Sequence, residues 1–178
     1  MADAIVIPGR LLGPGAPLPF YSGDVAERRG ATVHRHSWTA TPPAFREPRT
    51  QDWVRDQLSP LLDRLPGHPL LIGTSLGSLA ATVAAERDLP AVWLTPLLFL
   101  PHVVAALGRA TAPFLLIGGT ADRDWDTTAA HRLTPHVYEV RAADHDLHVP
   151  GPLTASIGVL AQVVEAVAEF LDEIGWPR

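Results

Sequence analysis

The sequence predicts a three-layer α/β/α sandwich built on a mostly parallel sheet of about six strands. Short apolar runs bounded by glycine and proline alternate along the chain with amphipathic segments of helical length. Most of the runs are continuously apolar, which is typical of strands buried on both faces in a parallel sheet. With 178 residues and neither a linker nor a low-complexity tail, the chain is expected to form one domain over residues 1–178.

The predicted strands are the short apolar runs that glycine, proline or polar residues terminate. In chain order they are AIVIP (4–8), ATVHRHSW (31–38), PLLIGT (69–74), AVWLT (91–95), PFLLIGG (113–119) and HVYEV (136–140). The segments between them are predicted as helices over 20–29, 51–65, 76–87, 102–108 and 127–134. A last helix over 154–174 has an apolar face of Leu160, Val163, Val164, Val167 and Leu171. The proline-rich stretch 39–48 is expected to be a surface loop.

One stretch is apolar enough to imitate a membrane span. Residues 89–108 carry no formal charge, but Pro90, Pro96 and Pro101 interrupt them, and proline breaks a helix. A buried strand, an apolar loop and a short helix are therefore predicted there. Because the N-terminus also lacks a basic segment followed by a long apolar run, we expect a cytoplasmic protein without a membrane partner.

Three residue types are missing, and each absence excludes a class of chemistry. Without cysteine the chain has no disulfide, thiolate nucleophile or zinc–thiolate site. All 14 basic residues are arginine, so there is no lysine for a Schiff base, a Ser–Lys dyad or a P-loop. Without asparagine, no asparagine side chain can stabilise an oxyanion.

The net charge and the amino-acid composition of the chain indicate which partners and which kind of source organism to expect. A net charge of −5 and the lack of a basic run argue against nucleic acid as a partner. The bias towards alanine, arginine, proline and glycine is typical of a GC-rich genome, so we expect a bacterial source.

The sequence GTSLG at 73–77 follows a predicted strand and precedes a predicted helix. In that setting the pattern G-x-S-x-G is typical of a nucleophile elbow, a strained turn that exposes a serine. Gly73 and Gly77 allow strand and helix to approach closely, and the Leu76 amide lies at a helix N-terminus, where negative charge is stabilised. The same residues also suit an ordinary turn with Ser75 as the helix cap, so the pattern alone does not decide.

Acidic residues follow the fifth predicted strand. Asp122 comes just past the strand end, with Asp124 and Asp126 close behind, and a carboxylate there could orient an imidazole. The D-x-D-x-D pattern also begins a calcium loop, but Thr127 stands where that loop needs glycine and Leu133 where it needs glutamate. We therefore expect Asp122 to have the functional role, and the other two aspartates to lie in a solvated loop.

Two histidines, His145 and His148, follow the last predicted strand. Histidine is the usual general base for a serine nucleophile because its pKa lies near working pH. An alternative is a zinc site built from Asp144, His145, Asp146 and His148, although no strong ligand motif supports it.

The loop PGRLLGPG at 8–15 is the expected source of a second oxyanion donor. Ligands of parallel sheets bind at the carboxyl ends of the strands, and this loop follows the first strand at that end. The backbone amides of Arg10 and Leu11 are the expected donors, together with the amide of Leu76. The glycines of this loop also resemble the nucleotide-binding turn of short-chain dehydrogenases. Three prolines where the phosphate-binding helix should start, and the missing lysine, argue against that alternative.

These features together resemble the α/β-hydrolase superfamily, and specifically its small members without a cap domain. The resemblance rests on IVIPG with its loop, GTSLG, LLIGGTAD and ADHDLHVPG, and it covers nearly the whole chain. It implies that Ser75 is the nucleophile, Asp122 the triad acid and His145 the base, in the expected chain order. Two departures are Thr74, where many members have histidine, and PGRLLG in place of an HGGG oxyanion loop. The two antiparallel strands that begin the superfamily's sheet have no counterpart.

The implied reaction is a two-step acyl transfer on a small-molecule carboxylic ester or thioester, through an acyl-enzyme and without a cofactor or a metal. The residues expected to line the substrate pocket are Leu12, Leu97, Phe99, Trp125 and His148. Two alternatives stay open, namely a catalytically silent fold that binds small molecules or partners, and an acyltransferase or peptidase with the same triad. The composition is compatible with a monomer or a homodimer.

Overall fold

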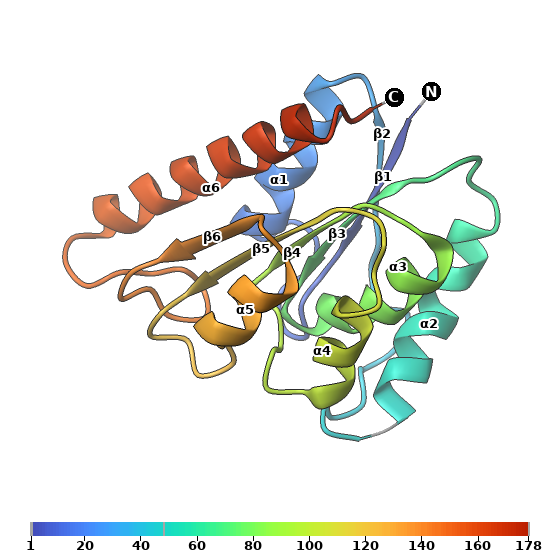
Figure 1. The fold of residues 1–178 in the computed structure, drawn as a ribbon, viewed down its shortest axis with the longest axis horizontal. Coiled ribbons are helices and arrows are strands. Elements are labelled where there is room, and N and C mark those ends of the chain that lie inside the picture. Colours follow the sequence, from blue (N-terminus) through green and yellow to red (C-terminus); the bar gives the residue numbers. More distant parts are fainter. Residues whose placement is uncertain (1, 48, 178) are drawn as a thin grey trace.

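A six-stranded sheet forms the centre of the molecule (Figure 1). The computed structural model describes residues 2–47 and 49–177, so Pro48 of the predicted loop 39–48 lies outside the described residues. The strands are β1 (Asp3–Ile7), β2 (Thr32–Arg35), β3 (Leu70–Thr74), β4 (Ala91–Leu94), β5 (Phe114–Gly119) and β6 (Val137–Val140). They follow the order β2-β1-β3-β4-β5-β6, and every neighbouring pair is parallel. The prediction of a mostly parallel sheet of about six strands is confirmed.

Helices cover both faces of this sheet. They are α1 (Pro17–Arg28), α2 (Arg49–Leu62), α3 (Ala81–Arg87), α4 (Pro101–Leu107), α5 (Thr127–Leu133) and α6 (Leu153–Glu173), with a 3-10 helix, η1 (Ser75–Ala80), before α3. Helices α1 and α6 lie on one face, whereas α2, α3, α4 and α5 lie on the other (Figure 1). The predicted three-layer sandwich is therefore confirmed.

The core consists of two apolar layers, one on each face of the sheet. Successive side chains of a strand point to opposite faces, so β1 contributes Ile5 and Ile7 to one layer and Ala4 and Val6 to the other. All four are fully buried. Burial on both faces explains why the inner strands β1, β3, β4 and β5 are almost entirely apolar, whereas the edge strands β2 and β6 are only partly buried and carry polar residues.

One helix of the described chain, α6, is long and apolar enough to span a membrane by length and composition alone, with a mean hydropathy of 1.5. Its residues Val163, Val167 and Leu171 are fully buried in the apolar layer beneath it. The first turns of α6 are less buried than the rest of the helix, since Leu153 and Ile157 are exposed. The apolar stretch 89–108 forms the strand, loop and short helix that were predicted for it, which are β4 and α4 with their connection.

The parallel arrangement gathers several loops at one edge of the sheet. Because all six strands point the same way, the segments that follow β1, β3, β4, β5 and β6 leave the sheet at the same edge. These segments carry the loop 8–15, Ser75, Thr95, Asp122 and His145, respectively. The fold thus brings together residues that are far apart in the sequence.

Candidate active site

Ser75 lies in a strained turn between β3 and η1. Its backbone φ is +50°, in the left-handed region that residues other than glycine rarely adopt. The two flanking glycines make room for this turn. A Cβ at Gly73 would lie 2.5 Å from the ring of Trp93, and one at Gly77 would lie 2.6 Å from the carbonyl oxygen of Ile7. The turn therefore has the form of a nucleophile elbow.

The segment after Ser75 differs from the single helix predicted over 76–87. It begins as the 3-10 helix η1 and becomes α-helical only at Ala81. The buried hydroxyl of Ser78 donates to the carbonyl oxygen of Ser75 at 2.7 Å, and it accepts the amide of Leu97 at 3.1 Å. Side-chain bonds of this kind compete with regular helical bonds, and here they tie the elbow to the loop that follows β4.

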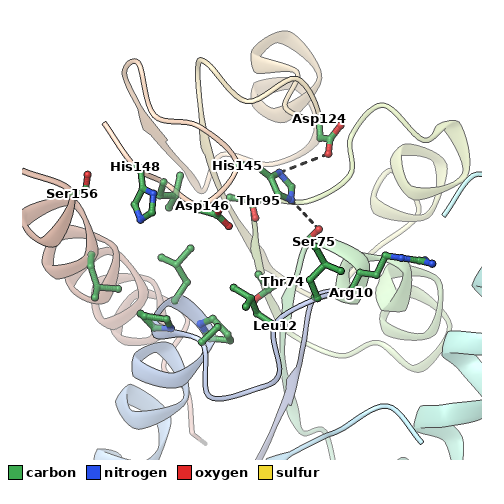
Figure 2. A pocket seen from close by; sticks show the side chains of 18 of the residues that line it. Arg10, Leu12, Thr74, Ser75, Thr95, Asp124, His145, Asp146, His148 and Ser156 are labelled. Atoms are coloured by element: carbon green, nitrogen blue, oxygen red, sulfur yellow. Dashed lines mark hydrogen bonds and ion pairs between the residues drawn. The ribbon is translucent and has the colours of Figure 1, made fainter. Parts of the chain in front are cut away.

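Hydrogen bonds connect three side chains from three strand ends. His145 Nδ1 lies 2.8 Å from Asp122 Oδ2, and His145 Nε2 lies 2.9 Å from Ser75 Oγ, as Figure 2 shows for the second pair. An ionised carboxylate only accepts, so the Nδ1–H donates to Asp122 and Nε2 accepts from the Ser75 hydroxyl. The structure brings together the three residues that the sequence analysis selected.

The carboxylate of Asp122 controls the charge state of His145. Its side chain is only 2% exposed, and its second oxygen, Oδ1, accepts the amide of Asp124 at 2.9 Å. The hydrogen bond that His145 donates to Asp122 raises the pKa of His145 above the ordinary value of 6.5, against the opposing effect of burial. The imidazole is therefore well placed to gain a proton from a neighbouring hydroxyl.

Asp124 lies in a partly exposed loop, with a side chain that is 32% exposed, but it also approaches His145, which was not expected. Its Oδ2 lies 3.7 Å from His145 Nδ1, beyond hydrogen-bond reach but close enough for an ion pair (Figure 2). Burial raises the pKa of the Asp124 carboxyl. Asp126 has a local role instead, because its Oδ1 caps α5 by accepting the amide of Ala129 at 2.8 Å.

Two of the four side chains proposed as zinc ligands, those of Asp144 and His145, have other hydrogen-bond partners. Asp144 Oδ1 accepts the amides of Asp146 and His148, at 3.0 Å and 2.9 Å, and so stabilises the turn that carries His145. Ligand atoms of Asp122, Asp124 and His145 do lie within 4.8 Å of one another. In the tautomer that the Asp122 carboxylate favours, Nδ1 of His145 carries the proton and presents no lone pair to a metal in that group.

A cavity of about 730 Å³ opens beside Ser75 and His145. It extends from the ends of β3 and β4 to the first turns of α6, and the loop after β1 forms part of its wall. Of the five side chains predicted to line the pocket, Leu12 and His148 do so.

The remaining three, Leu97, Phe99 and Trp125, do not line this cavity, so the prediction is wrong for them. Leu97 is fully buried in the core, where its amide bonds to Ser78. The indole of Trp125 packs over Gly118, and its Nε1 donates to Glu139 at 2.7 Å. The ring of Phe99 packs against the core under the guanidinium of Arg46. Beyond Thr95, the loop after β4 therefore packs Leu97 and Phe99 against the core instead of the cavity.

The loop after β1 passes directly beside Ser75. A Cβ on Gly9 would lie 3.6 Å from the Cβ of Ser75, and Arg10, Leu11 and Leu12 follow along the wall of the cavity. The indole Nε1 of Trp38 holds this loop by donating to the carbonyl oxygen of Gly9 at 2.9 Å. Neither Gly9 nor Trp38 was selected from the sequence, because their contact joins segments that no local pattern relates.

Two threonines at strand ends were also missed. The hydroxyls of Thr74 and Thr95 are buried and have no hydrogen-bond partner within the described chain, and both residues line the cavity. Thr95 has a φ of +43°, which is a second strained position beside Ser75. Since Thr95 follows β4 directly, the rule that ligands bind at strand ends could have found it.

Comparisons with known proteins agree with this geometry at the level of the fold. No family model and no curated protein matches the chain. Among solved structures, Est1E from Butyrivibrio proteoclasticus, with ferulic acid bound, is 14% identical with a TM-score of 0.71, over 97% of this chain and 89% of that one. An α/β serine hydrolase without a lid from Xanthomonas campestris is 16% identical with a TM-score of 0.63, over 95% and 82%. The chain has the α/β-hydrolase fold.

Two details sharpen this assignment. A candidate hydrolase of the α/β superfamily, also from Xanthomonas campestris, is 24% identical with a TM-score of 0.67 and matches 97% of this chain and 99% of that one. This solved structure of the same fold therefore has nearly the same length as the chain. The likeness to a structure without a lid confirms the prediction of a cap-less form.

Proposed function

We propose that the protein is a serine hydrolase that cleaves a small carboxylic ester or thioester through an acyl-enzyme. The observation that carries the proposal is the chain of hydrogen bonds from the buried Asp122, through His145, to Ser75 in its strained turn. This chain ends at the wall of a cavity large enough for a small molecule. The hydrolase fold of the solved structures supports the same reaction class.

In the proposed mechanism, Ser75 Oγ forms a bond to the carbonyl carbon while its proton moves to His145 Nε2. Asp122 holds the imidazole and stabilises its charged form. The tetrahedral intermediate collapses as the leaving alcohol or thiol takes the proton from His145. A water molecule, deprotonated by the same nitrogen, then releases the acid and restores Ser75.

The oxyanion is proposed to bind backbone amides on two sides of Ser75. The Leu76 amide lies in the first turn of η1, where amides have no partner within the helix. The amides of Arg10 and Leu11 follow Gly9, which lies beside Ser75. These donors are backbone groups, which suits a chain without asparagine, and the mechanism uses neither a metal nor a cofactor.

Labelling of the folded protein with a fluorophosphonate tests the proposal. Intact mass should show one adduct on the wild type and none on Ser75→Ala, whereas the control Ser59→Ala, in α2, should be labelled like the wild type. A folded wild type that stays unlabelled would contradict the hydrolase and would favour the silent binding fold. Transfer of the acyl group to an added alcohol or amine faster than to water would indicate an acyltransferase.

The base assignment needs its own comparison. On p-nitrophenyl acetate, His145→Ala should lower kcat at least about 10³-fold, because the residual rate then comes from binding and the oxyanion site alone. His148→Ala should stay within about tenfold of the wild type, since a group that only lines the pocket contributes less. The reverse order of these two effects would move the role of base to His148.

A further inference from the structure

Exposed apolar side chains gather around the mouth of the cavity. The large apolar residues that the described chain exposes are Leu11, Leu12, Phe20, Tyr21, Leu153 and Ile157. Four of them, from the loop after β1 and from the first turns of α6, line the cavity that contains Ser75. Leu11 is 90% exposed. An apolar patch of this kind, concentrated at one site, marks a binding surface.

The cavity is divided by polarity. At its inner end lie Ser75 and the buried hydroxyls of Thr74 and Thr95, which have no partner within the described chain. Towards α6 the walls are mainly apolar side chains, including Leu12, Ile157 and Leu160. Figure 2 shows Leu12 between Ser75 and the α6 side of the cavity, where Ser156 lies. A reacting carbonyl suits the inner end and a hydrocarbon chain suits the α6 side.

The charges at the cavity are mainly negative. Asp124 and Asp146 both line it. Arg10 is the one arginine among the lining residues that the structure describes, and its guanidinium donates to the carbonyl oxygen of Pro43 and lies 5.6 Å from the ring centroid of Phe45. Figure 2 shows this side chain extending away from His148 and α6. A chain that ended in a carboxylate would therefore meet the like charges of Asp124 and Asp146 and would have no guanidinium facing it, although the imidazoles of His145 and His148 also line the cavity.

We propose, on the basis of the hydrolase function above, that this apolar groove binds an uncharged hydrocarbon chain of the ester and disfavours chains that end in a carboxylate. The groove is defined as Leu11, Leu12, Leu153, Ile157 and Leu160. The chain can belong to the acyl group or to the alcohol, since both present the same chemistry to the groove. We assign the substrate's own chain to the groove because the groove residues line the same cavity as Ser75 and His145.

Two substrate series test the groove on the wild-type protein. In one, kcat/KM is compared for p-nitrophenyl acetate, p-nitrophenyl pentanoate and the p-nitrophenyl monoester of glutaric acid. In the other, it is compared for ethyl acetate and pentyl acetate. Each fully buried methylene favours binding roughly fourfold, so three more in an open groove should raise kcat/KM about tenfold. The glutarate monoester should be at least about tenfold poorer than the pentanoate.

The two series also identify the chain. A preference for length in the acyl series assigns it to the acyl group, and a preference in the alcohol series assigns it to the alcohol. No preference in either series, or a glutarate monoester as good as the pentanoate, would overturn the proposal. If the protein is labelled by the fluorophosphonate but shows no preference for chain length, only the proposal about the groove is wrong. If it is neither labelled nor able to hydrolyse any of these esters, both the proposed hydrolase function and the groove proposal are wrong.

Variants then locate the effect. Leu12→Ser and Ile157→Ser, both at exposed positions, should each lower the ratio of long-chain to short-chain kcat/KM about threefold to fivefold. Tyr21→Ser, an exposed aromatic position on α1 outside the cavity, should leave the ratio unchanged. Far-UV circular dichroism checks that all three fold. If Ile157→Ser instead breaks a dimer and leaves the ratio unchanged, the patch is covered by a second copy of the chain and the proposal is wrong.

Discussion

At the scale of single residues, His145 lies beside two carboxylates of different burial. The side chain of Asp122 is 2% exposed and that of Asp124 is 32% exposed. Only Asp122 reaches Nδ1 at hydrogen-bond distance, whereas Asp124 acts across 3.7 Å. The first carboxylate can orient the imidazole and fix its tautomer, and the second can only add charge.

Replacing each carboxylate by its amide should separate these roles. Asp122→Asn should lower kcat about 10⁴-fold, because an amide can hold the imidazole in the wrong tautomer. Asp124→Asn should lower it less than about tenfold, since the orienting hydrogen bond remains. Steady-state kinetics on p-nitrophenyl acetate measures both. Equal losses in the two variants would show that the carboxylates act as a pair.

The pH dependence of activity should follow the raised pKa of His145. General-base catalysis requires the neutral imidazole, so kcat/KM should fall as pH decreases through this pKa, with its half-maximal point above pH 6.5. Asp124→Asn removes a negative charge that stabilises the protonated ring, and the half-maximal point should move to lower pH. A profile of kcat/KM between pH 5 and 9 is the measurement. A shift to higher pH in the variant would contradict the assignment.

Trp38 is expected to position the loop that carries the proposed oxyanion donors. Trp38→Phe keeps an aromatic ring but removes the hydrogen bond to the carbonyl oxygen of Gly9. Because that bond holds the loop beside Ser75, kcat should fall about tenfold while KM changes little. Trp53→Phe is the matched control, since the ring centroids of Trp53 and Trp38 lie 5.0 Å apart but Trp53 does not line the cavity. An equal loss in both variants would indicate a packing role only.

At the scale of elements, the elbow depends on close contact between η1 and β1. Gly77→Ala would place a methyl group 2.6 Å from the carbonyl oxygen of Ile7, in the backbone of a central strand. Overpacking of this kind should lower the free energy of unfolding by about 1–3 kcal/mol. Urea unfolding monitored by circular dichroism measures the change.

The matched control is Gly158→Ala in α6. A Cβ at Gly158 meets no atom within 4 Å, so the substitution replaces a poor helix former by a good one without a clash. It should raise the free energy of unfolding by about 0.5–1 kcal/mol. Stabilisation by both substitutions would show that the contact between Gly77 and Ile7 is looser than described.

The elements themselves follow closely from sequence patterns. Each run predicted as a strand overlaps an observed strand, and the signal is strongest for the inner strands, because burial on both faces requires apolar residues. The difference at 76–87 has a local cause that periodicity does not reveal. There, the hydroxyl of Ser78 bonds to Ser75 and Gly77 packs on β1, so the first turn is a tighter 3-10 helix.

At the scale of the whole molecule, the sheet lies between two apolar layers, and its strands contribute side chains to both. Trp38, Trp53, Trp93 and Trp125 lie with the layer under α2 to α5, whereas α6, the longest helix, covers the other layer. Tryptophan fluorescence therefore reports mainly on the layer under α2 to α5, whereas far-UV circular dichroism reports on the helices of both faces, α6 included.

These two signals should change together on unfolding in urea. The strands contribute side chains to both layers, so neither face can lose its packing while the other keeps it. Coincident transitions with one midpoint are expected for the single domain predicted from the sequence. Two separated midpoints would show that the layers unfold independently and would contradict a single cooperative domain.

The sequence by itself determined the fold class and the chain order of the three connected side chains. Local patterns suffice for this because buried strands must be apolar, and because parallel strands bring their carboxyl ends to one edge. Ser75, Asp122 and His145 each follow such a strand, so their meeting could be predicted without knowing any distance.

Only the tertiary structure decided what surrounds these residues. Leu97 and Trp125 are as apolar in the sequence as Leu12 and Ile157, yet the first two are buried in the core and the last two line the cavity. Likewise, the roles of Gly9, Trp38 and Asp124 depend on contacts between segments distant in the chain. Hydrophobicity shows that a side chain avoids water, and the packing of distant elements decides whether it meets the core or a substrate.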